Sequence, residues 1–131
     1  MTPSVKTFSE LSLDELYGIL KLRAEVFILE QQCPYQDLDG LDQTGRHVMF
    51  WHGNSLLAYA RLLPVGQRYP DAASIGRVVT AKSVRGSGLG QQLMETALAE
   101  CQSAWPEAPI TISAQAYLEA FYQRLGFEPQ G

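Results

Sequence analysis

Apolar side chains recur at helical spacing early in the chain. Between Leu13 and Phe27 they return every three or four positions, and this period predicts a helix from about Leu13 to Ile28. Ser12 and Glu15 stand three positions apart at its start, which is the pattern of a capping box. The short apolar stretch before this helix, Val5 to Phe8, is expected to form a first strand.

Aromatic and aliphatic residues then predict two strands and a tight turn. The strands are expected at His47–Trp51 and Leu56–Leu63, and Gly53-Asn54 between them is a turn signal. These features together predict an antiparallel hairpin. The segment before it, from Gln31 to Gly45, contains proline, glycine and several aspartates and is expected to be a loop.

The second half of the chain predicts a strand–helix–strand unit. Its strands are expected at Ser74–Thr80 and Ile110–Ala114, and a helical period lies between them at Leu93, Met94, Ala97, Leu98 and Cys101. Such a unit pairs its strands in parallel, so the hairpin and this unit together predict a mixed sheet. A last helix is expected over Tyr117–Leu125.

The composition is that of one soluble globular domain over residues 1–131, with 46% hydrophobic and 18% charged residues. The net charge of −4 argues against nucleic acid as a partner. No apolar run approaches the ~18 residues of a membrane helix, and the first residues lack the pattern of a signal peptide. We therefore expect a cytoplasmic protein without a membrane partner. No histidine or cysteine spacing indicates a metal site.

The sequence Arg85-Gly86-Ser87-Gly88-Leu89-Gly90 joins the strand at Ser74–Thr80 to the next helix. Glycines allow positive φ and close approach of an anion to the backbone, and the start of a helix favours negative charge. The segment lacks both the lysine of a P-loop and the third glycine of a dinucleotide motif. From the glycines alone, a phosphate site and a plain tight turn both stay open.

Two motifs in this order resemble the GNAT family of N-acetyltransferases. RGSGLG resembles the family's R/QxxGxG/A motif, and AYLEAFYQRLGF, Ala116 to Phe127, resembles a later motif beside the thioester. The stretch Arg23 to His47, together with Ile75 to Val79, is similar to the ElaA-like branch of this family. The resemblance implies an α/β (α+β) fold, in which helices flank a mixed, mostly antiparallel sheet and a central parallel strand pair forms the acetyl-CoA site.

The resemblance also assigns the cofactor contacts. In the family the loop amides hold the CoA pyrophosphate, and the preceding strand lies along the pantetheine arm. The residues expected to bind acetyl-CoA are therefore Val78, Val79, Thr80, Arg85, Gly86, Ser87, Gly88, Leu89, Gly90 and Tyr122.

Three residues carry the expected chemistry. Tyr122 matches the family tyrosine that protonates the leaving CoA thiolate, and its alternative is a core aromatic residue. Val79 would offer its backbone N–H to the thioester carbonyl. Glu30 is a candidate general base or water-holding residue, because an alkyl amine is mostly protonated near pH 7 and must lose a proton. An ordinary polar residue at a helix end is the equal alternative for Glu30.

Asp37 and Asp39 lie in an acidic stretch that the resemblance places on the acceptor side of the cleft. An acidic mouth would attract a cationic amine, and a polar surface loop is the alternative. Arg61 and Arg77 either face the substrate or pair with these acids. All four residues are expected substrate-binding residues.

The chain ends at Gly131, just after the last motif, whereas the GNAT fold normally continues with one or two strands. The C-terminal strands are therefore expected to be missing. An open sheet edge invites pairing, so a homodimer is one expectation.

The activity that the resemblance implies is the acetyl-CoA-dependent acetylation of a primary amine by direct attack on the thioester. A catalytically idle CoA-binding or sensing module is the alternative from another class. A further alternative is other acyl-CoA chemistry on the same fold, because Arg23 to Gln31 faintly resembles acyl-homoserine-lactone synthases.

Overall fold

A computed structural model of the chain describes residues 2–30 and 37–112, with the backbone alone for Glu30. The predicted helix over Tyr117–Leu125 and the end of the predicted strand at Ser113 and Ala114 lie outside these residues. Within them, no helix is long and apolar enough to cross a membrane. No group of three or more acidic, histidine or cysteine side chains in the same residues could hold a metal ion.

The centre of the fold is a five-stranded sheet in the order β1-β2-β3-β4-β5. The first four strands pair antiparallel with their neighbours, and β5 joins β4 in parallel. The bounds of the strands are β1 Pro3–Thr7, β2 Arg46–His52, β3 Ser55–Leu63, β4 Ala73–Thr80 and β5 Ile110–Ile112. The predicted hairpin and the predicted parallel pair are both confirmed, and the sheet is mixed and mostly antiparallel.

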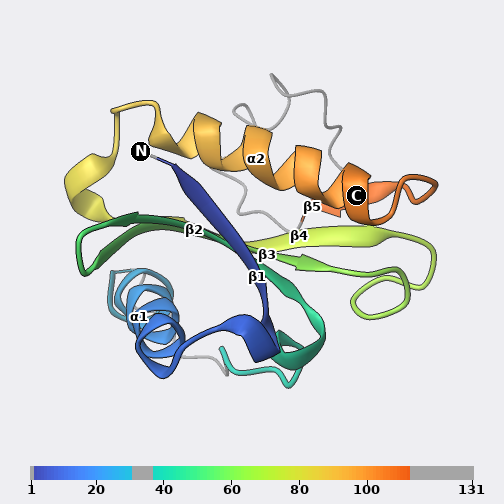
Figure 1. Cartoon of the computed structure of the whole chain (residues 1–131), viewed down its shortest axis with the longest axis horizontal. Helices are drawn as coiled ribbons and strands as arrows, with labels where there is room; N and C mark the ends of the chain where they lie inside the picture. The colour runs from blue at the N-terminus through green and yellow to red at the C-terminus, as the bar shows by residue number, and fades with distance from the viewer. Residues whose placement is uncertain (1, 31–36, 113–131) are drawn as a thin grey trace.

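Two helices cover opposite faces of the sheet, with α1 below it and α2 above it in Figure 1. Helix α1, Leu13–Arg23, begins at the predicted capping box. There the Glu15 N–H donates to the Ser12 hydroxyl at 3.0 Å, and the Ser12 N–H donates to the Glu15 carboxylate at 2.8 Å. Helix α2 spans Leu89–Ala104.

The predicted helix from Leu13 to Ile28 is α-helical only as far as Arg23. It continues as a π-helical segment over Ala24–Glu30, in which Val26 and Phe27 stay buried against the sheet. Apolar residues spaced three to four positions apart predict an ordinary α-helix, and π-helical turns are rare, so the apolar pattern did not indicate the change.

The two faces of the sheet carry separate apolar clusters. The α2-face cluster is centred on Leu93, Met94, Ala97 and the strand residues beneath them. The α1-face cluster consists of Ile19, Leu22, Val26, Phe27, Met49, Leu56, Tyr59 and Val79. Alternation of inward and outward side chains along β2 and β3 supplies residues to both clusters, so this sheet is buried on both faces.

Candidate functional site

The link between β4 and α2 is the glycine-rich turn, drawn in gold at the left of Figure 1. Gly86 and Gly88 have left-handed backbone angles, with φ of 85° and 89°, a region that disfavours residues with a Cβ. A Cβ added at either position would meet no atom within 4 Å. The backbone angle therefore requires these two glycines, and they leave the surface of the turn bare.

The turn opens α2 with features that favour an anion. Gly88 is the N-cap residue and has no side chain that could cap the helix, and the first turn contains no acidic residue. Free N–H groups at a helix start carry partial positive charge. The exposed Lys82 and Arg85 precede the turn, and Arg85 donates to the Thr80 carbonyl at 3.2 Å. These residues fit a phosphate-bearing ligand.

Strand β4 contains an extra residue beside β3. Tyr59 pairs with Val79 whereas Arg61 pairs with Gly76, so one residue of β3 faces two residues of β4 in a β-bulge. Arg77 lies in this bulge with φ of 50°, and it is the one non-glycine residue with positive φ in the described part of the chain. That conformation costs about 1–2 kcal/mol, so neighbouring contacts must hold Arg77 in place.

The bulge changes which residues of β4 face each helix. Before it, Ile75 lies in the α2-face cluster, and after it Val78 packs against the same cluster. Val79 lies in the α1-face cluster. Unbroken alternation from Ile75 would have placed Val79 on the α2 face instead.

The strand register also determines where backbone N–H groups point. Ala81 donates its N–H to the Leu57 carbonyl at 2.8 Å, and N–H groups two residues apart in a strand point to the same side. The Val79 N–H therefore faces Tyr59 of β3, and the Thr80 N–H faces the opposite edge. This direction does not favour the predicted contact between the Val79 N–H and the thioester, which stays a prediction.

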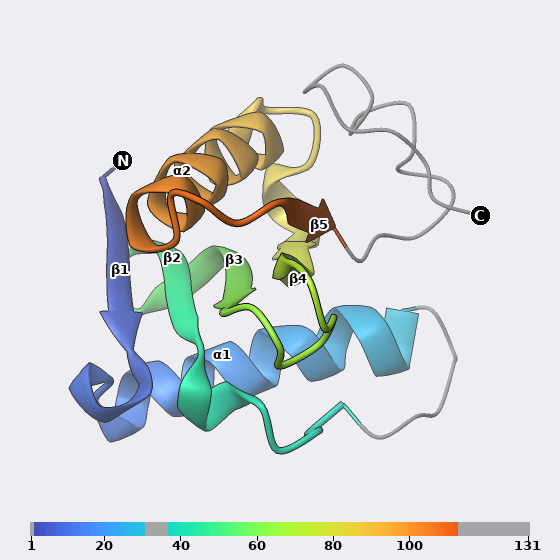
Figure 2. The same cartoon turned by 90° about the vertical axis from the view of Figure 1, so that its right-hand side faces the viewer.

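Three arginines and three aspartates form a closed ring of ion pairs, the Arg–Asp ring. Each carboxylate contacts two guanidinium groups, at N–O distances from 2.7 to 3.2 Å. The members in order around the ring are Arg23, Asp37, Arg77, Asp39, Arg61 and Asp42. The aspartates come from the segment before β2, which Figure 2 shows in cyan on the α1 side of the sheet. The ring thus ties this segment to α1, β3 and β4.

Hydrogen bonds and charge compensation keep the Arg–Asp ring ionised despite its burial. The side chains of Arg23 and Arg61 are 0% and 2% exposed. Burial alone would raise the pKa of Asp39, but hydrogen bonds from Arg61 and the Leu41 N–H, with the charges of Arg61 and Arg77, hold that pKa well below its usual range. Of the two alternatives that the sequence left open for Arg61 and Arg77, the structure shows pairing with the acids.

His47 and Tyr59 form a buried pair beside the ring. The Nε2 atom of His47 lies 2.9 Å from the Asp42 carbonyl oxygen, which can only accept, so Nε2 carries the proton. Nδ1 then accepts from the Tyr59 hydroxyl at 2.6 Å. Burial lowers the pKa of His47 despite the opposing contact with Asp42, and burial raises the pKa of Tyr59. Both side chains are therefore neutral near pH 7.

The structure brings some of the predicted site residues together and leaves others undescribed. Of the residues predicted to bind acetyl-CoA, Val78–Thr80 lie at the end of β4, and Arg85–Gly90 lie in the glycine-rich turn and the first residues of α2. Asp37, Asp39, Arg61 and Arg77 meet in the Arg–Asp ring. Tyr122 and the motif around it lie outside the described residues, and the side chain of Glu30 is not described.

Arg23 belongs to the ring but was not among the predicted site residues. A signal for it was present, because Arg23 follows Ile19 by four positions and so lies on the apolar face of α1. A charged residue at such a position is rarely buried without a partner. Its partners could not be named from sequence, since Asp37 and Asp42 lie 14 and 19 positions further on.

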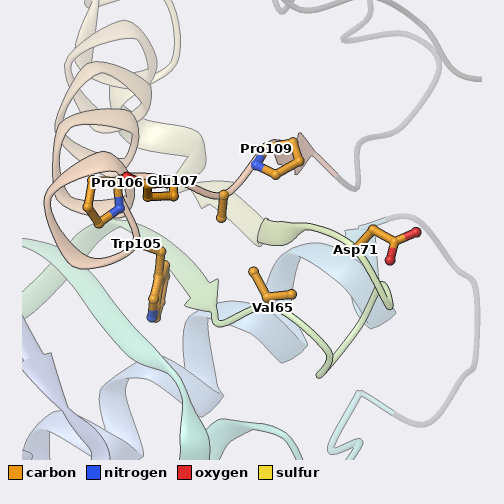
Figure 3. A pocket seen from close by; sticks show the side chains of 7 residues that line it. Val65, Asp71, Trp105, Pro106, Glu107 and Pro109 are labelled. Atoms are coloured by element: carbon orange, nitrogen blue, oxygen red, sulfur yellow. The ribbon is translucent and has the colours of Figure 1, made fainter.

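A shallow hollow of about 370 Å³ lies at the other end of α2 (Figure 3). Val65, Trp105 and Pro109 form its apolar lining, and Asp71 and Glu107 are its charged residues. Because α2 has 16 residues, the hollow is about 24 Å from the glycine-rich turn. With two acidic residues and no basic one in its lining, it does not fit a phosphate-bearing ligand.

Comparisons with known proteins agree with this geometry. Residues 7–131 match the acetyltransferase (GNAT) domain family. The chain is 47% identical over 123 residues to Protein ElaA of Escherichia coli (strain K12), a match that covers 92% of this chain and 80% of that protein.

Solved structures give the same result. The crystal structure of an acyl-CoA N-acyltransferase from Pseudomonas aeruginosa superposes with a TM-score of 0.90 at 47% identity, covering 96% of this chain and 87% of that one. The crystal structure of Escherichia coli ElaA has a TM-score of 0.90 at 41% identity, with 99% and 93% covered. The chain therefore belongs to the GNAT acetyltransferase family and is ElaA-like within it.

Proposed function

We propose that this protein is an acetyl-CoA-dependent N-acetyltransferase that transfers the acetyl group to a primary amine. The observation that carries the proposal is the glycine-rich turn, in which two left-handed glycines leave a bare surface at the start of α2. Membership of the GNAT family supports an acyl-CoA as the donor.

The cofactor would lie along the end of β4 and the turn. The backbone N–H groups of Gly86, Gly88 and Gly90 would hold the pyrophosphate at the positive end of the helix dipole. The N–H groups of Arg85, Ser87 and Leu89 already donate within the turn. The strand from Val78 to Thr80 would line the pantetheine arm. When bound, acetyl-CoA supplies the thioester whose acyl group is transferred.

The amine nitrogen would attack the thioester carbonyl carbon directly, and the carbon–sulfur bond would then break. The oxyanion that forms needs a backbone donor on the β4 edge that faces away from β3. The register gives Thr80 an N–H on that edge and turns the N–H of Val79 to the other side. We therefore propose that the oxyanion accepts from the Thr80 N–H on this edge of β4 and not from the Val79 N–H.

Two proton transfers complete the reaction. We propose that Tyr122 gives a proton to the departing CoA thiolate, and that Glu30, directly or through water, takes the proton that the amine must lose. The role of Tyr122 follows from the motif resemblance, and that of Glu30 from the need to take a proton from an alkyl amine. The reaction relies mainly on holding the amine nitrogen close to the thioester carbonyl carbon in the right orientation.

The acceptor is an amine whose identity is open. Asp37 and Asp39 were predicted to attract it, but their carboxylates are compensated by arginines within the Arg–Asp ring. We propose that these aspartates, with Arg61 and Arg77, hold the loop before β2 against β3 and β4 and do not contact the amine. The cytoplasmic location and the homodimer stay predictions.

An assay of amine-dependent CoA release tests the function. Purified protein would be incubated with acetyl-CoA and single primary amines: a polyamine, an aminoglycoside, an amino acid and a lysine peptide. Free thiol and the mass of the acetylated amine would both be measured. Stoichiometric thiol and acetyl-amine are expected for at least one acceptor class. Tight acetyl-CoA binding without turnover across the panel would favour the CoA-binding module instead.

A further inference from the structure

Arg77 combines an unfavourable backbone conformation with a set of polar contacts. Its φ of 50° is left-handed, and its guanidinium lies in the Arg–Asp ring with 16% of the side chain exposed. Nε lies 2.9 Å from Oδ1 of Asp37, and one terminal nitrogen donates to the Asp37 carbonyl at 3.0 Å and to Oδ2 of Asp39 at 3.2 Å. The side chain is thus anchored on the loop before β2.

The anchors of Arg77 are themselves held on both sides. Arg23 contacts Asp37 from the end of α1, with Nε 2.9 Å from Oδ2. Arg61 contacts Asp39 from β3 through two hydrogen bonds of 2.7 Å, in a bidentate arrangement. A bidentate guanidinium–carboxylate pair fixes direction as well as distance. The aspartates that receive Arg77 are therefore fixed by two separate elements.

The backbone that follows Arg77 is the edge that would receive acetyl-CoA. The bulge sets Val78 on the α2 face, Val79 on the α1 face, and the Thr80 N–H away from β3. If Arg77 left the left-handed region, the extra residue of β4 would no longer be accommodated, and these directions would reverse.

We propose that Arg77 is a positioning residue, and that the Arg–Asp ring holds the β4 bulge in the form that presents Val78–Thr80 to the acyl-CoA. The identity of the ligand, an acyl-CoA, rests on the proposed function. The hold of the Arg–Asp ring on the β4 bulge is a property of the fold and does not depend on that function. Arg77 acts through the backbone and through Asp37 and Asp39, and it does not need to touch either substrate.

The first test is Arg77→Gly, because glycine adopts the positive φ freely and removes only the contacts of the side chain. Asp39→Asn is a second variant, since Asp39 contacts both Arg61 and Arg77. The matched control is Asp42→Asn. Asp42 belongs to the same ring and also contacts two arginines, Arg23 and Arg61, but it does not contact Arg77.

The rate of amide hydrogen exchange in the segment 76–81 reports how stably the bulge is held, and it can be measured without any ligand. Exchange at least about tenfold faster than in the wild type is expected in Arg77→Gly and Asp39→Asn, with β2 unchanged as the internal reference. In Asp42→Asn this segment should change no more than the rest of the sheet. Wild-type exchange in the segment for both Arg77→Gly and Asp39→Asn would overturn the proposal, whether or not the protein binds acetyl-CoA.

Kinetics separates positioning from direct substrate contact. Arg77→Gly should raise the Kd and the KM for acetyl-CoA about tenfold and leave the KM for the amine unchanged. A raised KM for the amine with unchanged acetyl-CoA affinity would mean that Arg77 binds the acceptor, and would overturn the proposal. A wild-type protein that binds no acetyl-CoA would count against the proposed function, and the exchange result would still decide the role of the ring.

Discussion

The Tyr59 hydroxyl donates a hydrogen bond of 2.6 Å to Nδ1 of His47, and both side chains are buried on the α1 side of the sheet. This bond needs an unprotonated Nδ1, because the proton on Nε2 is already directed at the Asp42 carbonyl. Protonation of His47 would remove the acceptor of Tyr59 and bury a cation next to Arg23 and Arg61. The pair therefore couples the stability of this region to pH.

We expect the free energy of unfolding to fall as the pH falls from 7.5 to 5. The folded state lowers the pKa of His47, so below about pH 6.5 the unfolded chain binds a proton that the folded chain does not. The slope would approach at most about 1.4 kcal/mol per pH unit. Urea denaturation at several pH values measures it. His47→Gln should flatten the slope, whereas replacement of the exposed His52 by Gln should leave it as in the wild type.

Loss of Arg23 should destabilise the fold strongly. Arg23→Met removes one partner from each of two carboxylates, those of Asp37 and Asp42, and breaking a buried ion pair in this way costs about 3–5 kcal/mol. Lys21→Met, at an exposed position of the same helix, is the control and should change stability by less than about 0.5 kcal/mol. Equal effects of the two substitutions in thermal denaturation would mean that the ring contributes little to stability.

The glycines of the turn should differ in their tolerance of alanine. Gly88→Ala forces a Cβ into a left-handed conformation, at a cost of about 1–2 kcal/mol, and should weaken acetyl-CoA binding at least tenfold. At Gly90 an added Cβ would lie 3.9 Å from Thr80, an ordinary contact. The motif that the turn resembles also accepts alanine there. Gly90→Ala should therefore keep both stability and binding, and similar Kd values for the two variants would contradict this assignment of the turn.

Tyr122→Phe tests the proposed proton donor. The variant should lower kcat by about 10²-fold, because a general acid typically contributes 10²–10⁴-fold, while the Kd for acetyl-CoA stays within about twofold. Tyr117→Phe removes a hydroxyl from the same motif and serves as the matched control, with kcat unchanged. A wild-type kcat in Tyr122→Phe would remove this residue from the mechanism.

Local patterns in the sequence were enough to predict several elements. The Ser12–Glu15 capping box and the hairpin turn at Gly53-Asn54 depend on residues close together in the chain, and both are present in the structure. The parallel pairing of β4 and β5 followed from the handedness of a strand–helix–strand unit.

The bulge at Arg77 and the Arg–Asp ring could not be predicted in the same way. The bulge is a property of the register between two strands. Gly76, directly before Arg77, is a local signal for a bulge, but it does not fix the register. The ring joins positions as far apart as Asp37 and Arg77, 40 residues along the chain. The direction of the Val79 N–H also lay beyond local patterns, because it depends on the pairing with Tyr59.

Calorimetric titration of acetyl-CoA into the purified protein tests the central claim most directly, with NADH and ATP as control ligands and Gly88→Ala as the control variant. The account predicts saturable binding of one acetyl-CoA per chain, weakened at least tenfold by Gly88→Ala, with no comparable binding of NADH or ATP. If the folded wild-type protein gave no binding heat with acetyl-CoA, or bound all three ligands alike, the glycine-rich turn would not be an acyl-CoA site and the proposed function would be wrong.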